Sequence, residues 1–188
     1  LPDLHEPMPP AHTALINAWA YMAEKVIHGE PSGVDNTVAT LGGAVAFTRA
    51  LPTNDLSENR LERIGFDAVR LLITDTRVVR STKELVARVS QQKQQDPTRV
   101  NAAFTMIQHL STEAKRLLCD SSLSRADLIS GLSLLMDLNH LQLVQLQVGH
   151  ATLELVRRLC AERHLRAKLT GAGGGGCAIT LLKDSMSD

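Results

Sequence analysis

Charge of one sign, aromatic side chains and uninterrupted apolar runs are all scarce in this sequence, and each shortage excludes a class of function. Twenty Lys and Arg residues balance twenty Asp and Glu residues, and only 3% of the residues are aromatic. Because no basic stripe is interleaved with aromatic residues, we do not expect nucleic acid as a partner. Charged or amide residues interrupt every long apolar stretch. We therefore expect no membrane span and no membrane partner.

Targeting signals and disulfide pairs are also missing. The first residues, Leu1 to Glu6, have neither the charged region nor the apolar region of a signal peptide. The cysteines are odd in number and widely spaced, which favours reduced thiols over a disulfide framework: Cys119, Cys160 and Cys177. A cytoplasmic protein is the simplest expectation. A peroxisomal address stays open, because we expect the sequence to lack the true C-terminus.

Local patterns indicate the first structural elements. Apolar spacing predicts a helix from about Thr13 to Val26, and Ser32 is a suitable N-cap for a short second helix. Gly42-Gly43 should end that helix, and Ala44 to Phe47 has the composition of a strand. The polar run from Leu51 to Arg63 is expected to connect elements on the surface.

Helices dominate the remainder of the sequence. Val69 to Thr74 is expected to be a strand, and Ser81 to Glu84 has the pattern of a capping box that opens a helix. The expected helices and the final strands are the following: helices to about Gln95, from Pro97 to Cys119, from Ser124 to Gln147 and from Ala151 to Arg163, then a strand, a glycine loop and a strand. This order predicts an α+β chain.

The glycine loop is the most informative feature of the sequence. Four consecutive glycines follow a Gly-Ala step between Lys168 and Cys177, and the following residues read as a buried strand. Glycine permits positive φ and close approach of a ligand, and successive N–H groups in such a loop can bind a phosphate. The loop lacks the Lys-Ser/Thr ending of a P-loop, and a simple turn between strands is the alternative. The candidate phosphate-binding residues are Gly171, Ala172, Gly173 and Gly174.

A second motif lies between Glu24 and Asn36. It places Glu24 near the end of one helix and Asp35 near the start of the next. A carboxylate near a helix N-terminus is held ionised by the helix dipole and by free N–H groups, and it can orient a substrate hydroxyl. The alternatives are that Asp35 caps its own helix, and that Glu24 is a solvated residue paired with Lys25 or His28.

The two motifs together resemble signatures of the mevalonate kinase family, in the GHMP kinase superfamily. The resemblance includes His28 to Asn36 and Lys168 to Cys177, with Thr74 to Thr76, Arg80 to Thr82 and Val148 to His150 in matching order. It implies a GHMP kinase-like fold, in which residues 1–67 form the C-terminal portion of the N-terminal domain. Residues 68–188 would then form a truncated, helix-rich C-terminal domain.

The resemblance also implies a reaction, the transfer of the γ-phosphoryl group of ATP to the primary hydroxyl of mevalonate. Asp35 matches the catalytic aspartate, and Glu24 matches the glutamate that binds Mg²⁺. Thr82 matches a threonine that hydrogen-bonds the catalytic aspartate, and Ser32 lies in the loop that lines the same site. The glycine loop would contact ATP. In the family the full-length protein is a homodimer.

Two other signatures of the family do not occur in this sequence. One carries a catalytic lysine, and the other supplies a serine to Mg²⁺ and surrounds the triphosphate. We therefore expect a chain that lacks the N-terminal part and the extreme C-terminus, that exposes strand edges and apolar faces, and that is not a competent kinase alone. Two alternatives stay open. One is another GHMP kinase that acts on a small alcohol. The other is a non-catalytic helical module, in which the helices between Ser81 and Arg163 bind a partner through their exposed faces.

Overall fold

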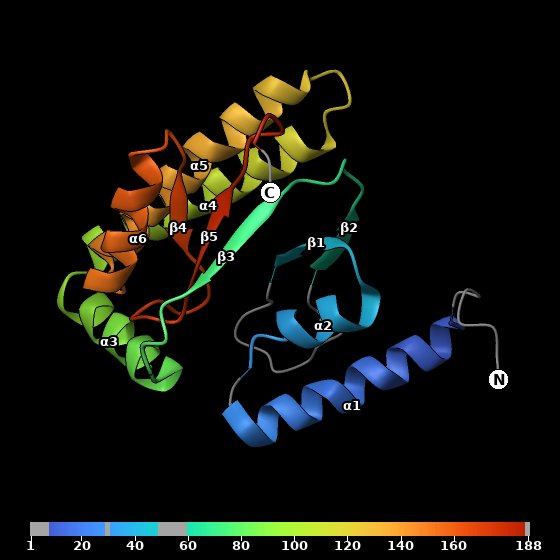
Figure 1. Ribbon diagram of the computed structural model, residues 1–188. Coiled ribbons are helices and arrows are strands. Elements are labelled where there is room, and N and C mark those ends of the chain that lie inside the picture. The colour runs from blue at the N-terminus through green and yellow to red at the C-terminus, as the bar shows by residue number, and fades with distance from the viewer. Residues whose placement is uncertain (1–7, 29–30, 49–59, 187–188) are drawn as a thin grey trace. The chain divides into compact units, whose positions relative to one another are not determined.

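Figure 1 shows the computed structural model, which describes residues 8–28, 31–48 and 60–186. Contacts divide the chain into two units, residues 1–65 (unit 1) and residues 66–188 (unit 2). Unit 1 contains a two-stranded sheet and unit 2 a three-stranded sheet. The mixture of helices and strands agrees with the predicted α+β class. Within the described ranges, none of the helices combines the length and the apolar character that a membrane span requires.

Unit 1 begins with two helices, α1 (Pro10–His28) and α2 (Val34–Leu41). The predicted N-cap at Ser32 is wrong, because Gly33 occupies the cap position with φ 87°. The chain needs this left-handed residue to enter α2, so the Ser32 hydroxyl instead accepts a hydrogen bond from the Val34 N–H at 3.3 Å. At the other end, Gly42 and Gly43 have φ values of 67° and 68° and end α2 as predicted.

The sheet of unit 1 is a pair of antiparallel strands, β1 (Ala44–Thr48) and β2 (Arg60–Ile64). The predicted strand at Ala44 is confirmed. The prediction of a surface connection as far as Arg63 is wrong for residues 60–63, and residues 51–59 of that prediction lie outside the described ranges. The physical reason is non-local, since β1 needs a hydrogen-bonding partner and the polar β2 supplies it.

The described residues of unit 2 form three strands and four helices. Its first part is β3 (Leu71–Asp75), α3 (Thr82–Gln95) and α4 (Pro97–Cys119). The second part is α5 (Arg125–Gln145), α6 (Ala151–Ala161), β4 (Ala167–Leu169) and β5 (Cys177–Leu181). These bounds agree with the predicted elements, including the strand that follows the glycine loop.

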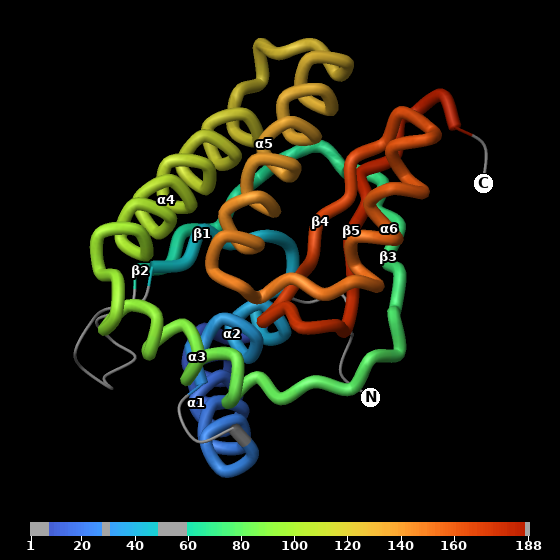
Figure 2. Tube along the Cα trace, turned by 90° about the vertical axis from the view of Figure 1, so that its left-hand side faces the viewer, coloured from blue at the N-terminus to red at the C-terminus, as the bar shows by residue number. Residues whose placement is uncertain are grey.

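The sheet of unit 2 has the order β3-β5-β4, and both pairs are antiparallel. Side chains alternate between its faces. Leu181 packs in a cluster with residues of α4 and α5, whereas Thr180 lies on the other face, with its hydroxyl 3.4 Å from Cys160 of α6. Figure 2 shows α4 and α5 beside each other, and β4 and β5 between this pair and α6.

Pairing of β3 with β5 positions the candidate site. Asp75 at the end of β3 is opposite Cys177 at the start of β5. The residues after Asp75 therefore run along the glycine loop that precedes Cys177, and the N-terminus of α3 follows them. A fully or largely buried cluster beneath this region combines residues of α3, α4, α6, β4 and β5 with the connection between α5 and α6: Leu85, Val100, Ala103, Leu146, Val148, Leu153, Leu169 and Ala178.

Candidate functional site

The loop between β4 and β5 has an unusual backbone. Gly171, Gly173, Gly174, Gly175 and Gly176 all have positive φ, between 68° and 126°. Glycine is required at several of them for space as well as for conformation. A Cβ atom at Gly173 would lie 2.1 Å from the carbonyl oxygen of Val148, and one at Gly175 would lie 2.6 Å from the Val78 side chain. The glycines therefore allow the chain to pack against neighbouring backbone.

Some of the loop N–H groups already have acceptors and others do not. The Gly174 N–H donates to Val148 O at 2.8 Å, and the Gly176 N–H donates to Val78 O at 3.4 Å. The N–H groups of Gly171, Ala172, Gly173 and Gly175 make no hydrogen bond to any described residue. Three of the four candidate phosphate-binding residues thus have an N–H without an acceptor among the described residues, although Gly173 is buried, whereas the N–H of Gly174 is engaged.

Arg80 lies against the glycine loop, a contact that the sequence does not predict. Its Nη1 atom donates to Gly173 O at 3.3 Å. A Cβ atom at Gly176 would lie 2.7 Å from the guanidinium carbon of Arg80, and one at Gly171 would lie 3.1 Å from Nη2. The pairing of β3 with β5 brings this cation to the loop. No local pattern carries that information, although Arg80 belongs to a motif that the resemblance includes.

Thr82 is the first residue of α3 and is exposed. The adjacent Ser81 is the N-cap, and its Oγ accepts a hydrogen bond from the Glu84 N–H at 3.3 Å. The predicted cap before this helix is therefore confirmed at Ser81. Because Ser81 performs this function, the Thr82 hydroxyl is not required as a cap.

The remaining candidates lie in unit 1. Asp35 is in the first turn of α2 and exposed, Glu24 is half-buried near the end of α1, and Ser32 is half-buried between the helices. Gly33, the N-cap of α2, has no side chain to form a capping bond, and the Val34 N–H donates to Ser32 rather than to Asp35. The alternative in which Asp35 serves only as the cap of its own helix therefore finds no support in the hydrogen bonds of α2.

Two side-chain amides, one buried and one half-buried, join the two helices beside Asp35. The side-chain amides of Asn17 on α1 and Asn36 on α2 are 2.6 Å apart, and Asn17 Nδ2 donates to the Thr37 hydroxyl at 3.5 Å. Helical spacing places Glu24 on the same side of α1 as Asn17. Glu24 therefore lies on the face of α1 that carries Asn17. Asn36, which bonds to Asn17, directly follows Asp35.

Each unit contains part of the predicted site. Unit 1 contains Glu24, Ser32 and Asp35, and unit 2 contains Thr82 and the glycine loop. Among the described residues, no group of three or more His, Cys, Asp or Glu side chains has a metal-binding arrangement. Mg²⁺ is often held by one or two carboxylates together with phosphate oxygens, so the single carboxylate of Glu24 is a suitable donor.

Known proteins with similar sequences share one activity in their names. Mevalonate kinase of Candida albicans is 41% identical over 174 residues, which are 92% of this chain and 40% of that protein. Mevalonate kinase of Homo sapiens is 40% identical over 173 residues, which are 92% of this chain and 42% of that protein. The chain thus spans less than half of the length of these curated relatives. No family model matches the chain.

The fold has the same relatives. A crystal structure of L. major mevalonate kinase in complex with R-mevalonate matches with a TM-score of 0.79 and 30% sequence identity. The match includes 92% of this chain and 50% of that chain. The fold is similar to that of a mevalonate kinase, one of the GHMP kinases, over nearly the whole chain. The chain is homologous to the mevalonate kinases over nearly its whole length.

Proposed function

We propose that these residues belong to a protein that transfers the γ-phosphoryl group of ATP to the primary hydroxyl of mevalonate. The observation that carries the proposal is the glycine loop, in which the N–H groups of Gly171, Ala172 and Gly173 have no acceptor within the described part of the chain and the guanidinium of Arg80 lies beside them. Backbone N–H groups and a cation are suited to a phosphate chain. Similarity to mevalonate kinases supplies the choice of substrate.

The proposed roles of the side chains follow the family resemblance. Asp35, exposed in the first turn of α2, accepts or orients the proton of the attacking hydroxyl. The resemblance assigns Thr82 to the support of a catalytic aspartate and Ser32 to the loop that lines the substrate. Glu24 is the residue that would hold Mg²⁺, which supplies charge neutralisation at the phosphate oxygens when bound. Phosphoryl transfer depends on positioning and charge more than on covalent assistance, so two carboxylates, a metal ion and a phosphate-facing loop form a coherent set.

The 188 residues alone are proposed not to be a competent kinase. They lack the two family signatures that carry the lysine and the main nucleotide cradle, and they span about 40% of the length of the relatives. We assign residues 1–67 to the end of the family's N-terminal domain and residues 68–188 to its C-terminal domain. A homodimeric assembly and a cytoplasmic location complete the proposal, and light scattering and imaging of the longer protein would test them.

The decisive experiment compares this chain with a version extended upstream through the two missing signatures. Both are assayed for ADP formation from ATP-Mg²⁺ and mevalonate. Activity in the extended protein alone is expected. Asp35→Asn in the extended protein should abolish turnover, and Asp67→Asn, a change at an exposed carboxylate with no proposed role, should not. A folded extended protein without activity would refute the proposal, and so would full activity of Asp35→Asn. Activity with other small alcohols but not mevalonate would favour another GHMP kinase.

A further inference from the structure

The outer edge of β4 is the starting point. Among the described strands, β4 lies at one edge of its sheet. Its Thr170 N–H, immediately after the strand, donates to Cys177 O on the β5 side at 3.0 Å. Because successive backbone groups alternate, the Leu169 N–H and the Ala167 carbonyl point away from β5. Leu169 and Ala167 are 1% and 2% exposed, so these two polar groups need protein partners.

Side chains from two helices supply these partners. His140 of α5 accepts a hydrogen bond from the Leu169 N–H at its Nδ1 atom, at 3.1 Å. Arg157 of α6 donates from Nε to Ala167 O at 3.3 Å. Because Nδ1 is an acceptor, the ring proton is on Nε2, which lies 2.7 Å from Glu154 Oε1 and donates to it. The completely buried imidazole is therefore held in one tautomer.

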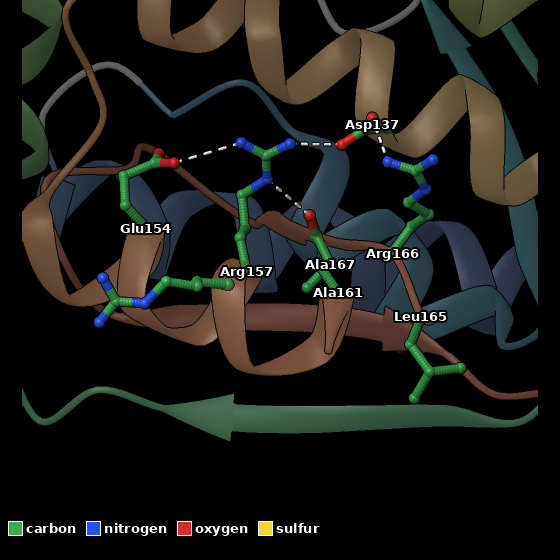
Figure 3. Close-up of a pocket in the computed structure, with 8 residues that line it drawn as sticks. Asp137, Glu154, Arg157, Ala161, Leu165, Arg166 and Ala167 are labelled. Carbon is green, nitrogen blue, oxygen red and sulfur yellow. Dashed lines mark hydrogen bonds and ion pairs between the residues drawn. The ribbon is translucent and has the colours of Figure 1, made fainter. Parts of the chain in front are cut away.

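Charged groups around His140 extend the arrangement. Glu154 also accepts from Arg157 at 3.2 Å, and Arg157 donates in turn to Asp137. Arg166 donates to the second oxygen of Asp137 at 3.0 Å. Figure 3 shows the two arginines on either side of Asp137, with Arg157 also reaching Glu154 and Ala167. Two carboxylates are thus matched by two guanidinium groups, and the imidazole is the remaining member of the network.

The surroundings favour the neutral imidazole. Burial lowers the pKa of His140, the hydrogen bond to Glu154 opposes this, and the positive charges of Arg157 and Lys168 lower it further. The pKa of His140 therefore lies below the ordinary histidine value of about 6.5. His140 is therefore neutral at pH 7, as its acceptor role requires.

We propose that His140 is a positioning residue for the glycine loop, acting through its hydrogen bond to the Leu169 N–H at the end of β4. The inference rests on the proposed role of that loop in phosphate binding. Leu169 is two residues before Gly171, and its side chain packs in the cluster that contains Val148, whose carbonyl accepts from Gly174. His140 thus fixes the entry of the loop, and Val148 fixes its middle.

A dependence on pH follows from this geometry. Protonation of His140 places a proton on Nδ1, so that two N–H groups face each other and the bond to Leu169 is lost. Glycine and alanine side chains do not titrate. A change of the loop backbone at the pKa of His140 would therefore identify the imidazole as its cause, whereas a role in packing alone would not couple the loop to pH.

The test follows backbone amide signals of Gly171, Gly173 and Gly175 by NMR in the 188-residue chain while the pH is lowered. We expect these signals to change with the same midpoint as the His140 imidazole. In His140→Asn the side-chain oxygen replaces Nδ1 as acceptor, so the loop signals should stay native and the transition should disappear. In His140→Gln the amide reaches toward Glu154 instead, and native loop signals should be lost at every pH.

A matched control and three outcomes decide the matter. His109→Asn, at an exposed histidine of α4, should leave the transition unchanged. Loop signals that ignore the titration of His140 would overturn the proposal. A transition that persists in His140→Asn would also overturn it, and so would native loop signals in His140→Gln. Should His140→Gln fail to fold, the first two comparisons still decide.

Addition of inorganic triphosphate separates this proposal from the proposed function. At pH values above the midpoint of the His140 titration, triphosphate should shift the amide signals of the loop. Below that midpoint the response should be lost. Added positive charge on His140 would by itself strengthen the binding of an anion, so a loss of the response points to the loop backbone. Coupling of the loop to His140 without any triphosphate response would support the positioning role and refute phosphate binding. A triphosphate response that does not depend on His140 would keep phosphate binding and overturn the positioning role.

Discussion

Substitution of Gly173 by alanine is the sharpest test of the loop geometry. The added Cβ would lie 2.1 Å from the Val148 carbonyl oxygen, closer than any real contact, and the φ of 82° is one that alanine rarely adopts. Val148 cannot move away without loss of its hydrogen bond from Gly174. Left-handed strain, overpacking and a lost hydrogen bond together are expected to cost about 3–6 kcal/mol.

Gly171→Ala is the matched control. Its φ of 70° carries similar strain, but the added Cβ would meet only the flexible end of Arg80, at 3.1 Å. The expected loss is about 1–2 kcal/mol, because the guanidinium can move. The difference between the two variants therefore measures the backbone contact rather than the loss of glycine.

Urea unfolding of both variants is the assay, with the amide signals of unit 2 as the probe. The sequence has a single Trp and a single Tyr, Trp19 and Tyr21, and both lie on α1 in unit 1. Their fluorescence reports unit 1 and should not change between the variants. Gly173→Ala is expected to unfold at a much lower urea concentration than Gly171→Ala, with a similar dependence on urea. Equal midpoints would refute the argument from the Val148 contact.

Three further changes test the rest of unit 2. Leu153 is 0% exposed, so Leu153→Ala should cost about 2–5 kcal/mol in urea unfolding, whereas Leu159→Ala, at a half-exposed position of the same helix, should cost far less. Ser81→Ala removes the N-cap of α3 and should cost about 1 kcal/mol, with the amide signal of Glu84 as the local probe. Burial raises the pKa of Glu154, but its hydrogen bonds and cationic neighbours outweigh this and leave the pKa below its ordinary value. The stability that this carboxylate contributes is present above its unfolded pKa of about 4.3 and is lost as the pH falls through the lowered folded pKa. In that pH window, the free energy of unfolding of Glu154→Gln should therefore depend less on pH.

Local chemistry explains which parts of the fold could be predicted. Helices begin or end at Gly42-Gly43, Ser81 and Pro97 because of backbone conformation and capping, which depend on residues nearby in the sequence. The strand β2 was missed because its polar residues are ordered by pairing with β1. The cap at Gly33 was missed because the left-handed entry into α2 leaves no pattern beyond a glycine.

The candidate site divides in the same way. The glycine run predicts a loop that could bind a phosphate. Its sequence does not indicate which of the loop N–H groups have an acceptor within the described part of the protein. That depends on Val78 and Val148, which approach from elsewhere in the chain. Arg80 likewise contacts the loop, and His140 contacts the end of the preceding strand, only because the fold brings together residues that are distant in the sequence. The roles assigned to Glu24, Asp35 and Thr82 stay predictions, which the kinase assay addresses.

Crowding around the glycine loop changes what its glycines mean for affinity. Glycine is usually associated with flexibility, yet here Val78, Leu85, Val148 and Arg80 occupy the space into which the loop could move. The loop is therefore already ordered before an anion arrives. An anion that binds there would not have to offset the conformational entropy of ordering a flexible segment, so more of its interaction with the N–H groups is retained as binding free energy.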